Sequence, residues 1–266
     1  MNSKSEQLKL YLAKAGSLAV AFSGGVDSAF LLKTAHDVLG SRMLAVTIQS
    51  RIFPMRELEE AKQFCMQHGI RQIVCNVDEL EIPGFSQNPK DRCYLCKRKM
   101  MQTVLDTAKE QGMAYAAEGS NVDDEGDYRP GHRAVAELGI LSPLREAGLT
   151  KAEIRGLSRQ TGLPTWDKQS FACLASRFVY GEEITPEKLS MIDRAEQLLL
   201  DLGFRQVRVR MHEQMARIEV LPKEFDRLLQ EDVRKRITAD FQKWGFTYVT
   251  MDLQGYRTGS MNEFFK

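Results

Sequence analysis

The sequence predicts an α/β fold, in which a parallel sheet with helices on both faces is followed by a smaller C-terminal α+β domain. Three observations support this prediction. The first part of the 266-residue chain alternates short apolar runs with amphipathic stretches, the middle has an irregular segment rich in turn residues, and the last third has two segments in which apolar and polar residues alternate. A chain of this length suits one large domain or two smaller ones.

Apolar runs and helix stops define the elements expected in the first domain. Strands are expected at residues 17–22, 43–48, 71–77 and 114–118, and helices at 27–39, 55–68 and 96–111. Gly69 and Gly112 follow two of these helices, as glycine commonly does at a helix C-terminus. In parallel sheets of this kind, ligands bind beyond the carboxyl ends of the strands.

The second domain is expected to begin after an irregular seam. Thr150 starts the capping-box pattern Thr-Lys-Ala-Glu, which predicts a helix to about residue 161. Residues 162–185 are irregular, so we expect domains at 1–165 and 166–266. Helices are then expected at 186–202, 223–230 and 232–244, half-exposed strands at 206–212 and 216–221, and a last strand at 246–253.

The composition excludes several classes of protein. Hydrophobic residues make up 43% and charged residues 27% of the chain, which argues against disorder. The 37 Lys and Arg balance 36 Asp and Glu, whereas proteins that coat nucleic acid usually have a strong basic excess. No apolar run approaches the roughly 20 residues that span a bilayer, and no signal peptide is visible, so we expect a cytoplasmic protein without a membrane or nucleic-acid partner.

A phosphate-binding loop is the clearest motif. It comes directly after the first expected strand and directly before a helix, and it consists of Ser23, Gly24, Gly25, Val26, Asp27 and Ser28. The glycines let the backbone approach an anion, the helix offers free N–H groups, and the serines add hydroxyl donors. Asp27 could hold a Mg²⁺ ion that bridges phosphates. The spacing and lysine of a Walker loop are absent, and the alternative is a tight turn with an Asp or Ser cap.

These residues resemble the PP-loop ATP pyrophosphatases, whose S-G-G-x-D-S pattern is matched at every fixed position. The resemblance implies an adenine nucleotide alpha hydrolase-like sheet and cleavage of ATP between the α- and β-phosphates. AMP is then transferred to a substrate oxygen and pyrophosphate leaves. The same resemblance implies that the adenine lies beside the end of the second strand, near Thr47 and Gln49.

A second polar stretch, residues 118–124, follows the fourth expected strand and should reach the same edge of the sheet. There Ser120, Asn121 and Asp124 could meet ribose, phosphate or Mg²⁺. The alternative is an Asx-rich surface turn.

The five cysteines favour metal or thiol chemistry over a disulfide framework. Cys93 and Cys96 form a C-x-x-C flanked by basic residues that favour thiolates, and Cys173 lies in the seam beside Arg177. Three such ligands would leave one iron of a 4Fe-4S cluster open to an extra sulfide. The alternative is three unrelated thiols. Cys65 and Cys75 lie among apolar residues and are expected in the core.

Arg208 and Arg210 stand two apart in an expected strand, so both side chains project from one face. Paired guanidinium groups suit a phosphate. The alternative is a solvated strand face paired with acids such as Glu219.

The whole chain resembles the LarE family of sulfur transferases. The resemblance rests on the phosphate loop, residues 121–131 (NVDDEGDYRPG), residues 173–177 (CLASR), the Arg208/Arg210 strand and residues 252–262 (DLQGYRTGSMN). It implies adenylation of a carboxylate of pyridinium-3,5-biscarboxylic acid mononucleotide, followed by sulfur transfer that expels AMP. The two thiocarboxylates so formed later hold nickel. It also implies that Arg208, Arg210 and Arg177 bind the substrate phosphate, with Glu196 near the same pocket.

Two branches of the family differ in their source of sulfur. In one, the single cysteine of the CLASR stretch gives up its own sulfur and becomes dehydroalanine. In the other, three cysteines hold a 4Fe-4S cluster, and the C-x-x-C together with Cys173 matches this branch. A sulfide source or cysteine desulfurase and a homo-oligomeric state are also expected.

Three other functions remain open from the sequence. A tRNA-thiolating PP-loop enzyme would need a basic surface, an amidating synthetase would use ammonia and leave the cysteines idle, and a nucleotide- and iron-sulfur-binding sensor would release no pyrophosphate.

Overall fold

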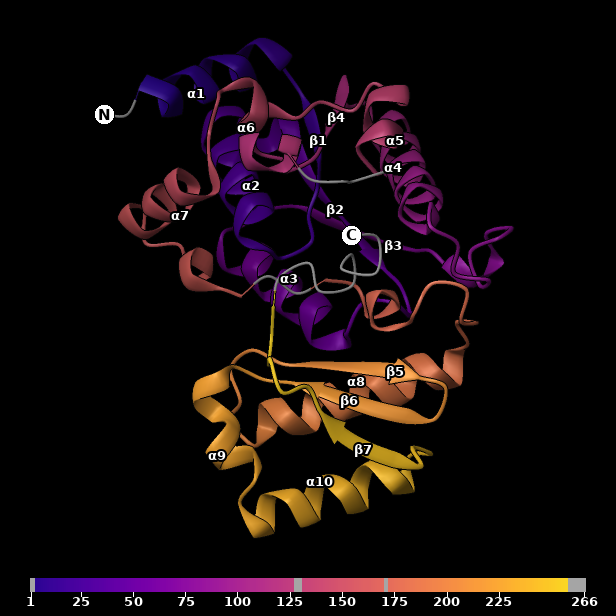
Figure 1. The fold of residues 1–266 in the computed structure, drawn as a ribbon. Coiled ribbons are helices and arrows are strands. Elements are labelled where there is room, and N and C mark those ends of the chain that lie inside the picture. Colours follow the sequence, from indigo (N-terminus) through magenta and orange to yellow (C-terminus); the bar gives the residue numbers. More distant parts are fainter. Residues whose placement is uncertain (1–2, 127–130, 170–171, 258–266) are drawn as a thin grey trace. The chain divides into compact units, whose positions relative to one another are not determined.

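The computed structural model of the protein describes residues 3–126, 131–169 and 172–257. The chain divides into two units (Figure 1). Unit 1 comprises Met1–Ile82 and Asp91–Phe171, and unit 2 comprises Pro83–Lys90 and Ala172–Lys266. The boundary therefore lies six residues after the expected position at 165/166.

The short segment Pro83–Lys90, which the sequence placed in the first domain, belongs instead to unit 2. Backbone hydrogen bonds attach it there, because Ile184 N donates to Ser86 O at 2.8 Å and Gly181 N donates to Asn88 O at 3.0 Å. The Asn88 amide nitrogen also donates to Val179 O at 2.6 Å. Such long-range pairing leaves no local pattern in the sequence.

Unit 1 contains the predicted parallel sheet. Its four strands run in the order β3-β2-β1-β4. The strands are β1 (Leu18–Ala21), β2 (Met43–Gln49), β3 (Gln72–Asn76) and β4 (Tyr115–Ala117). Leu18 of β1 lies opposite Met43 on one side and Tyr115 on the other. The expected strands are confirmed, with ends that shift by at most one residue.

Among the helices of unit 1, α1, α6 and α7 pack against α2, α4 packs against α5, and α3 packs against β2 (Figure 1). The helices are α1 (Ser3–Ala15), α2 (Val26–Leu39), α3 (Met55–Gln67), α4 (Arg92–Glu110), α5 (Gly131–Glu137), α6 (Pro143–Glu146) and α7 (Lys151–Gln160). Short 3₁₀ turns occupy Gly40–Arg42, Glu79–Glu81, Val122–Gly126 and Pro164–Asp167. Helices α1, α5 and α6 were not predicted.

Local sequence explains how two of these helices begin and pack. The predicted capping box at the start of α7 is confirmed, since Thr150 N donates to Glu153 Oε2 at 2.9 Å and Glu153 N donates to Thr150 Oγ1 at 3.3 Å. Helix α1 is polar except for a narrow stripe, and its Leu8 and Leu12 are completely buried in the core of unit 1. Two apolar residues four apart are a weak signal, which is why this helix was missed.

Unit 2 is a small α+β unit. Its strands β5 (Arg208–His212), β6 (Met215–Glu219) and β7 (Tyr248–Met251) lie in that order, with β5 antiparallel and β7 parallel to β6. Its helices are α8 (Pro186–Asp201), α9 (Phe225–Leu228) and α10 (Glu231–Lys243), and 3₁₀ turns occupy Leu174–Arg177 and Pro222–Glu224.

The prediction that β5 is half exposed was wrong, because Arg208 and Arg210 are buried together with Val209 and Met211. Glu196 of α8 and Glu219 of β6 lie beside these arginines and make their burial possible. Among the helices that the structure describes, none is long and apolar enough to cross a bilayer.

Candidate functional site

The phosphate loop joins β1 to α2 at the carboxyl edge of the sheet in unit 1. Gly24 has φ +74°, a conformation that L side chains rarely adopt. Gly25 is the N-cap of α2, and no side chain within the described residues caps it. The geometry therefore differs from the alternative of a turn with an Asp or Ser cap. The Ser23 and Ser28 hydroxyls lie 3.1 Å apart, and Ser28 Oγ donates to Gly25 O at 3.1 Å.

Asp27 lies in the first turn of α2, and only one of its two carboxylate oxygens has a hydrogen-bond partner among the described residues. Its Oδ2 pairs with Nζ of Lys151, the first residue of α7, at 2.5 Å. Its Oδ1 is buried and has no hydrogen-bond partner in the part of the chain that the structure describes. Burial raises the pKa of Asp27, the Lys151 ammonium opposes that shift, and the negative charge of Asp124 adds to it. A buried carboxylate oxygen without a partner, near a second acid, suits a divalent cation.

The polar stretch after β4 combines local turn contacts with buried groups. Asn121 Oδ1 accepts from Asp123 N at 2.9 Å, and Asp124 Oδ2 accepts from Asn121 N at 3.0 Å. This is the Asx turn that the alternative interpretation expected. Ser120 and Asn121 are nevertheless buried. Within the expected LarE-type segment 121–131, residues 127–130 lie outside the described residues.

Glu118, which lies directly after β4, has a role that sequence reasoning missed. Its buried carboxylate accepts from Ser120 Oγ and Ser142 Oγ, both at 2.8 Å, and pairs with Lys97 Nζ at 3.4 Å. Burial alone would raise the pKa of Glu118, but the Lys97 charge and these hydrogen bonds hold it below its ordinary value. Glu118 therefore remains a carboxylate and connects β4 to the start of α4.

Gly119 brings this stretch against the phosphate loop. A Cβ atom at position 119 would lie 3.1 Å from Ser28 N and 3.2 Å from Ser28 Cα. These are backbone atoms of the first turn of α2, so they cannot swing aside as the end of a flexible side chain could.

The Gly119→Ala variant is therefore expected to bind ATP about tenfold more weakly, because the added methyl group displaces the loop backbone. Isothermal titration with Mg-ATP measures the change. Gly156→Ala is the matched control, since a Cβ atom there would meet nothing within 4 Å. Equal affinity in the two variants would show that the loop tolerates the displacement.

Cys93 and Cys96 lie in the first two turns of α4, three positions apart on one helical face. Cys93 is exposed, and Cys96 is half-buried with its thiol 3.7 Å from Met100 Sδ. The helix begins at Arg92, four residues earlier than expected. Both sulfurs belong to unit 1, whereas Cys173 belongs to unit 2. Among the residues described, no group of three or more His, Cys, Asp or Glu side chains could hold a metal ion.

The remaining cysteines and the expected adenine contacts lie in the sheet and its helices. Cys65 is buried, and burial raises the pKa of its thiol to about 12, which fits a core residue. Cys75 is half-buried, with Sγ 3.4 Å from Thr107 Oγ1. Thr47 is buried and its hydroxyl accepts from Gln72 Nε2 at 2.7 Å. Gln49 is the last residue of β2 and lies, half-buried, at the carboxyl edge.

Unit 2 contains a cluster of buried arginines. Arg177 donates from Nε and Nη2 to the two carboxylate oxygens of Glu196, each at 2.8 Å. Its Nη1 donates to Ala172 O at 2.9 Å and to Cys173 O at 3.1 Å. Burial alone would lower the pKa of Arg177, but the Glu196 charge holds it above its ordinary value. Glu196 also accepts from Val209 N at 2.9 Å, so both of its oxygens bind groups inside the protein.

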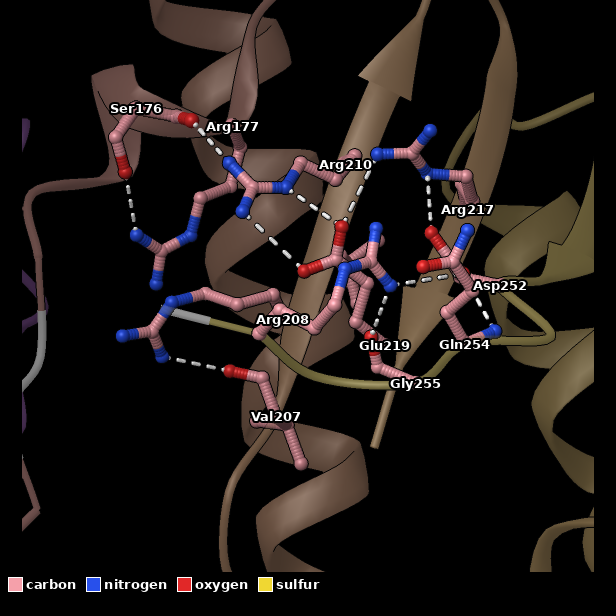
Figure 2. Close-up of polar contacts among 12 residues, drawn as sticks. Ser176, Arg177, Val207, Arg208, Arg210, Arg217, Glu219, Asp252, Gln254 and Gly255 are labelled. Atoms are coloured by element: carbon pink, nitrogen blue, oxygen red, sulfur yellow. Dashed lines mark hydrogen bonds and ion pairs between the residues drawn. The ribbon is translucent and has the colours of Figure 1, made fainter. Parts of the chain in front are cut away.

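Arg210 and Arg217 converge on the carboxylate of Glu219 (Figure 2). Arg210 donates from Nε to Glu219 Oε1 at 2.9 Å, from Nη2 to Oε2 at 3.2 Å, and from Nη1 to Ser176 O at 2.7 Å. The pairing with Glu219 that the sequence offered as an alternative is thus present, but Glu219 is completely buried rather than solvated.

Arg208 is the third buried arginine of the cluster. Its Nη1 donates to Val207 O at 2.7 Å, and its guanidinium lies 5.1 Å from the centre of the Tyr256 ring. Burial and the positive charge of Arg177 lower the pKa of Arg208 to about 10. The arginines are 1%, 4% and 8% exposed at positions 177, 208 and 210, and the two glutamates are 0% exposed. Three buried guanidinium groups gathered in one cluster can offer several N–H donors to a phosphate.

The tail segment that the sequence singled out reaches this cluster. Asp252 accepts from Gln254 N at 2.9 Å (Figure 2). Arg257 Nη1 lies 3.4 Å from Asp252 Oδ1. Tyr256 N donates to Val220 O at 2.8 Å, which fixes the backbone beside Arg208. The tail beyond Arg257, with Gly259, Ser260 and Asn262, lies outside the described residues.

Comparisons with known proteins place these features in context. A family model described as NAD synthase matches residues 1–109, which include the phosphate loop. The chain is 37% identical, over 248 residues, to the pyridinium-3,5-bisthiocarboxylic acid mononucleotide synthase of Lactiplantibacillus plantarum, covering 92% of this chain and 89% of that protein. It is 42% identical, over 262 residues, to an uncharacterised protein of Synechocystis, covering 98% of each. A glutamine-hydrolysing GMP synthase component from Thermoplasma acidophilum is 29% identical over 203 residues, covering 70% of this chain and 64% of that protein.

Proposed function

The chain belongs to the LarE family of PP-loop ATP pyrophosphatases, and from this membership we propose its reaction. The protein transfers sulfur, at the expense of ATP, to the carboxylates of pyridinium-3,5-biscarboxylic acid mononucleotide. The product is the bisthiocarboxylic acid mononucleotide after which the Lactiplantibacillus plantarum relative is named. The observation that carries the proposal is the cluster of three buried arginines at positions 177, 208 and 210, because a mononucleotide substrate brings a phosphate anion.

The first step activates a carboxylate. One carboxylate oxygen of the substrate attacks the α-phosphorus of ATP, the bond from that phosphorus to the oxygen bridging the β-phosphate breaks, and pyrophosphate leaves with the electron pair. We assign ATP binding to the phosphate loop, where the N-terminus of α2, the two glycines and the hydroxyls of Ser23 and Ser28 are donors for phosphate oxygens. Ser120, Asn121, Asp124, Thr47 and Gln49 complete the proposed nucleotide site.

Mg²⁺ fits beside Asp27, whose buried Oδ1 has no hydrogen-bond partner among the described residues. When bound, the ion would neutralise charge on the departing pyrophosphate. Lys151 already contacts Asp27, so we propose that its ammonium helps to orient this carboxylate and to balance the same charge.

The second step replaces oxygen by sulfur. A sulfur nucleophile attacks the acyl carbon, the bond from that carbon to the oxygen of AMP breaks, and AMP leaves with the electron pair. Two rounds convert both carboxylates to thiocarboxylates. We propose that Arg208, Arg210 and Arg177 bind the substrate phosphate. Glu196 would orient Arg177 rather than touch the phosphate, since its oxygens already accept from Arg177 and Val209.

We further propose that Cys93, Cys96 and Cys173 hold a 4Fe-4S cluster. Support comes from the donor set: none of the three is in a disulfide bond, and two of them share one face at the start of α4. The bound cluster would provide an iron with an open position for the sulfide that is to be transferred. The competing proposal is that Cys173 gives up its own sulfur. A sulfide donor such as a cysteine desulfurase would supply further rounds.

Release of pyrophosphate and AMP tests the reaction directly. With Mg-ATP, we expect both products only when the mononucleotide is also present, together with thiocarboxylate formation. A protein that releases neither product is a sensor, one that forms an amide from ammonia is an amidating synthetase, and one that retains tRNA on a filter at low salt belongs with the tRNA-thiolating enzymes.

The Arg210→Ala variant is expected to raise KM for the mononucleotide by roughly 10- to 100-fold, the usual effect of losing a charged hydrogen bond. Affinity for ATP should not change, because the proposed ATP site lies in unit 1. Steady-state kinetics at saturating ATP measure the first effect and titration with Mg-ATP the second.

Two further variants control for damage to the fold. Arg210→Lys keeps the positive charge beside buried Glu219, and its KM should lie between those of the wild type and Arg210→Ala. Arg236→Ala removes an exposed arginine of α10 that pairs with Asp240, and should change nothing. Parallel losses of ATP and mononucleotide binding in Arg210→Ala would contradict the assignment of this arginine to the substrate.

A further inference from the structure

Lys168 contacts the phosphate loop from a distant part of the chain, and the proposed function gives it no role. It directly follows the 3₁₀ turn Pro164–Asp167, and its side chain is 14% exposed. Its Nζ lies 3.2 Å from Gly24 O, 2.8 Å from Glu57 Oε2 and 2.6 Å from Glu60 Oε2. One ammonium group therefore uses its three N–H donors on three oxygens.

The backbone that carries Lys168 is itself fixed. Arg155 of α7 donates from Nη1 to Trp166 O at 2.6 Å and from Nη2 to Lys168 O at 2.8 Å. Lys168 N also donates to Thr165 O at 3.0 Å. Hydrogen bonds at Trp166 and at Lys168 thus fix the backbone from which the lysine side chain reaches the phosphate loop.

The contact with Gly24 O determines the orientation of one peptide group. In a trans peptide the carbonyl of one residue and the N–H of the next point in opposite directions. Lys168 holds the Gly24 carbonyl toward itself, so the Gly25 N–H is directed to the opposite side. Gly25 is the N-cap of α2, and the N–H groups at this helix end are the donors that an anion would use.

A peptide between two glycines needs such a restraint. Gly24 already has φ +74°, and glycine populates positive and negative φ with similar ease. The Gly24–Gly25 peptide plane can therefore flip at a low cost in free energy. A turned peptide would present a carbonyl oxygen, which repels phosphate, where the N–H should be. The hydrogen bond from Lys168 favours one of the two orientations.

The charges argue against Lys168 as a direct phosphate ligand. Its ammonium faces two carboxylates, those of Glu57 and Glu60, both on the first turns of α3. The three side chains of Lys168, Glu57 and Glu60 together carry one negative charge, so a phosphate would gain little from this ammonium.

We propose that Lys168 is a positioning residue, which locks the Gly24–Gly25 peptide so that the Gly25 N–H faces the phosphates of ATP. This inference rests on the proposed ATP site at the phosphate loop. It gives a role to a residue of the irregular seam, where the sequence showed only a break between domains.

The test compares Lys168→Met with the wild-type protein in titrations with Mg-ATP and, separately, with inorganic pyrophosphate. Loss of one restraining hydrogen bond should weaken both by about tenfold and leave the affinity for the mononucleotide unchanged. Lys168→Arg retains a donor and should recover part of the loss. Lys4→Met is the control, because it removes another lysine–glutamate ion pair of the same unit, the one between Lys4 and Glu153.

Glu57→Gln separates positioning from direct contact. If Lys168 acts through Gly24, weakening its anchor should reduce ATP affinity in the same direction as Lys168→Met. If Lys168 binds phosphate itself, freeing it from Glu57 should increase ATP affinity, and that result would overturn the inference. Equal ATP affinity in the wild type and Lys168→Met would overturn it as well, while the proposed function would stand. Failure of the wild-type protein to bind ATP would overturn both.

Discussion

Replacing Glu196 by alanine is expected to lower the free energy of unfolding of unit 2 by about 3–5 kcal/mol, the usual cost of removing one partner from a buried ion pair. Arg177 is 1% exposed and donates two hydrogen bonds to Glu196. Without that carboxylate, the guanidinium remains buried beside a second cation, Arg208, whose pKa is already lowered. The Val209 N–H loses its acceptor at the same time.

The same pair predicts a dependence of stability on pH. Burial alone would raise the pKa of Glu196, but Arg177 holds it below its ordinary value of 4.5. A carboxylate with a lowered pKa in the folded protein stabilises it at pH above the ordinary value, and this stabilisation is lost as the pH falls through the lower folded value. The difference between the wild type and Glu196→Ala should therefore be constant near neutral pH and shrink in acid.

Urea titration measures this effect, with Trp244 of unit 2 as the fluorescent reporter in a Trp166→Phe background. Asp240→Ala, which removes an exposed pair with Arg236, should cost less than about 1 kcal/mol. The double variant Arg177→Met with Glu196→Leu should recover most of the loss, since an apolar pair can replace a buried ion pair. If Glu196→Ala unfolds at the wild-type urea concentration, the pair does not support the fold in the way its geometry indicates.

Much of the fold could be predicted because its signals are local. Each strand of the parallel sheet is a short apolar run, and Gly69 and the capping box at Thr150 define helix ends within a few residues of sequence. The elements that were missed lack such signals. Helix α1 has only two buried leucines, and α6 is a single turn beginning at Pro143. The transfer of Pro83–Lys90 to unit 2 depends on backbone pairing with residues about 90 positions away.

The candidate site also contains residues with a local sequence signal and residues without one. The phosphate loop was visible because its glycines, serines and aspartate are consecutive. The sequence did not identify Lys151, Lys168 and Glu118 as parts of the site. Each belongs to it only through a contact with a residue distant in sequence, which the fold creates. The burial of Arg208 and Arg210 was also hidden, since alternation in a strand does not reveal that carboxylates from α8 and β6 neutralise its polar face. Lys151 did carry a usable signal: a basic residue directly after a helix N-cap is unfavourable for the helix dipole, which suggests a role outside the helix.

Replacing Cys93 by alanine is expected to abolish multiple-turnover sulfur transfer if the proposed cluster carries the sulfide. Two remaining thiolates are too few to retain a 4Fe-4S cluster firmly, so protein reconstituted without oxygen should fall from about four irons per chain to nearly none. Cys93 is exposed at the start of α4, so the substitution removes a thiol without opening a cavity in the core. Iron and acid-labile sulfide analysis measures the cluster, and thiocarboxylate formation measures turnover.

The adenylation step distinguishes this loss from damage to the ATP site. Cys93→Ala should still release pyrophosphate when Mg-ATP and the mononucleotide are present, because none of the groups proposed to bind ATP is changed. Cys75→Ser is the matched control: its sulfur lies near Thr107 Oγ1, a hydroxyl can keep that contact, and both iron content and turnover should be unaffected.

The two proposals for the sulfur source predict different results for this variant. Iron-free Cys93→Ala protein that still completes one turnover and converts Cys173 to dehydroalanine would assign the sulfur to Cys173 itself. Full multiple turnover without iron would show that neither the cluster nor the sacrifice of Cys173 is required, and that sulfide reaches the acyl adenylate by another route.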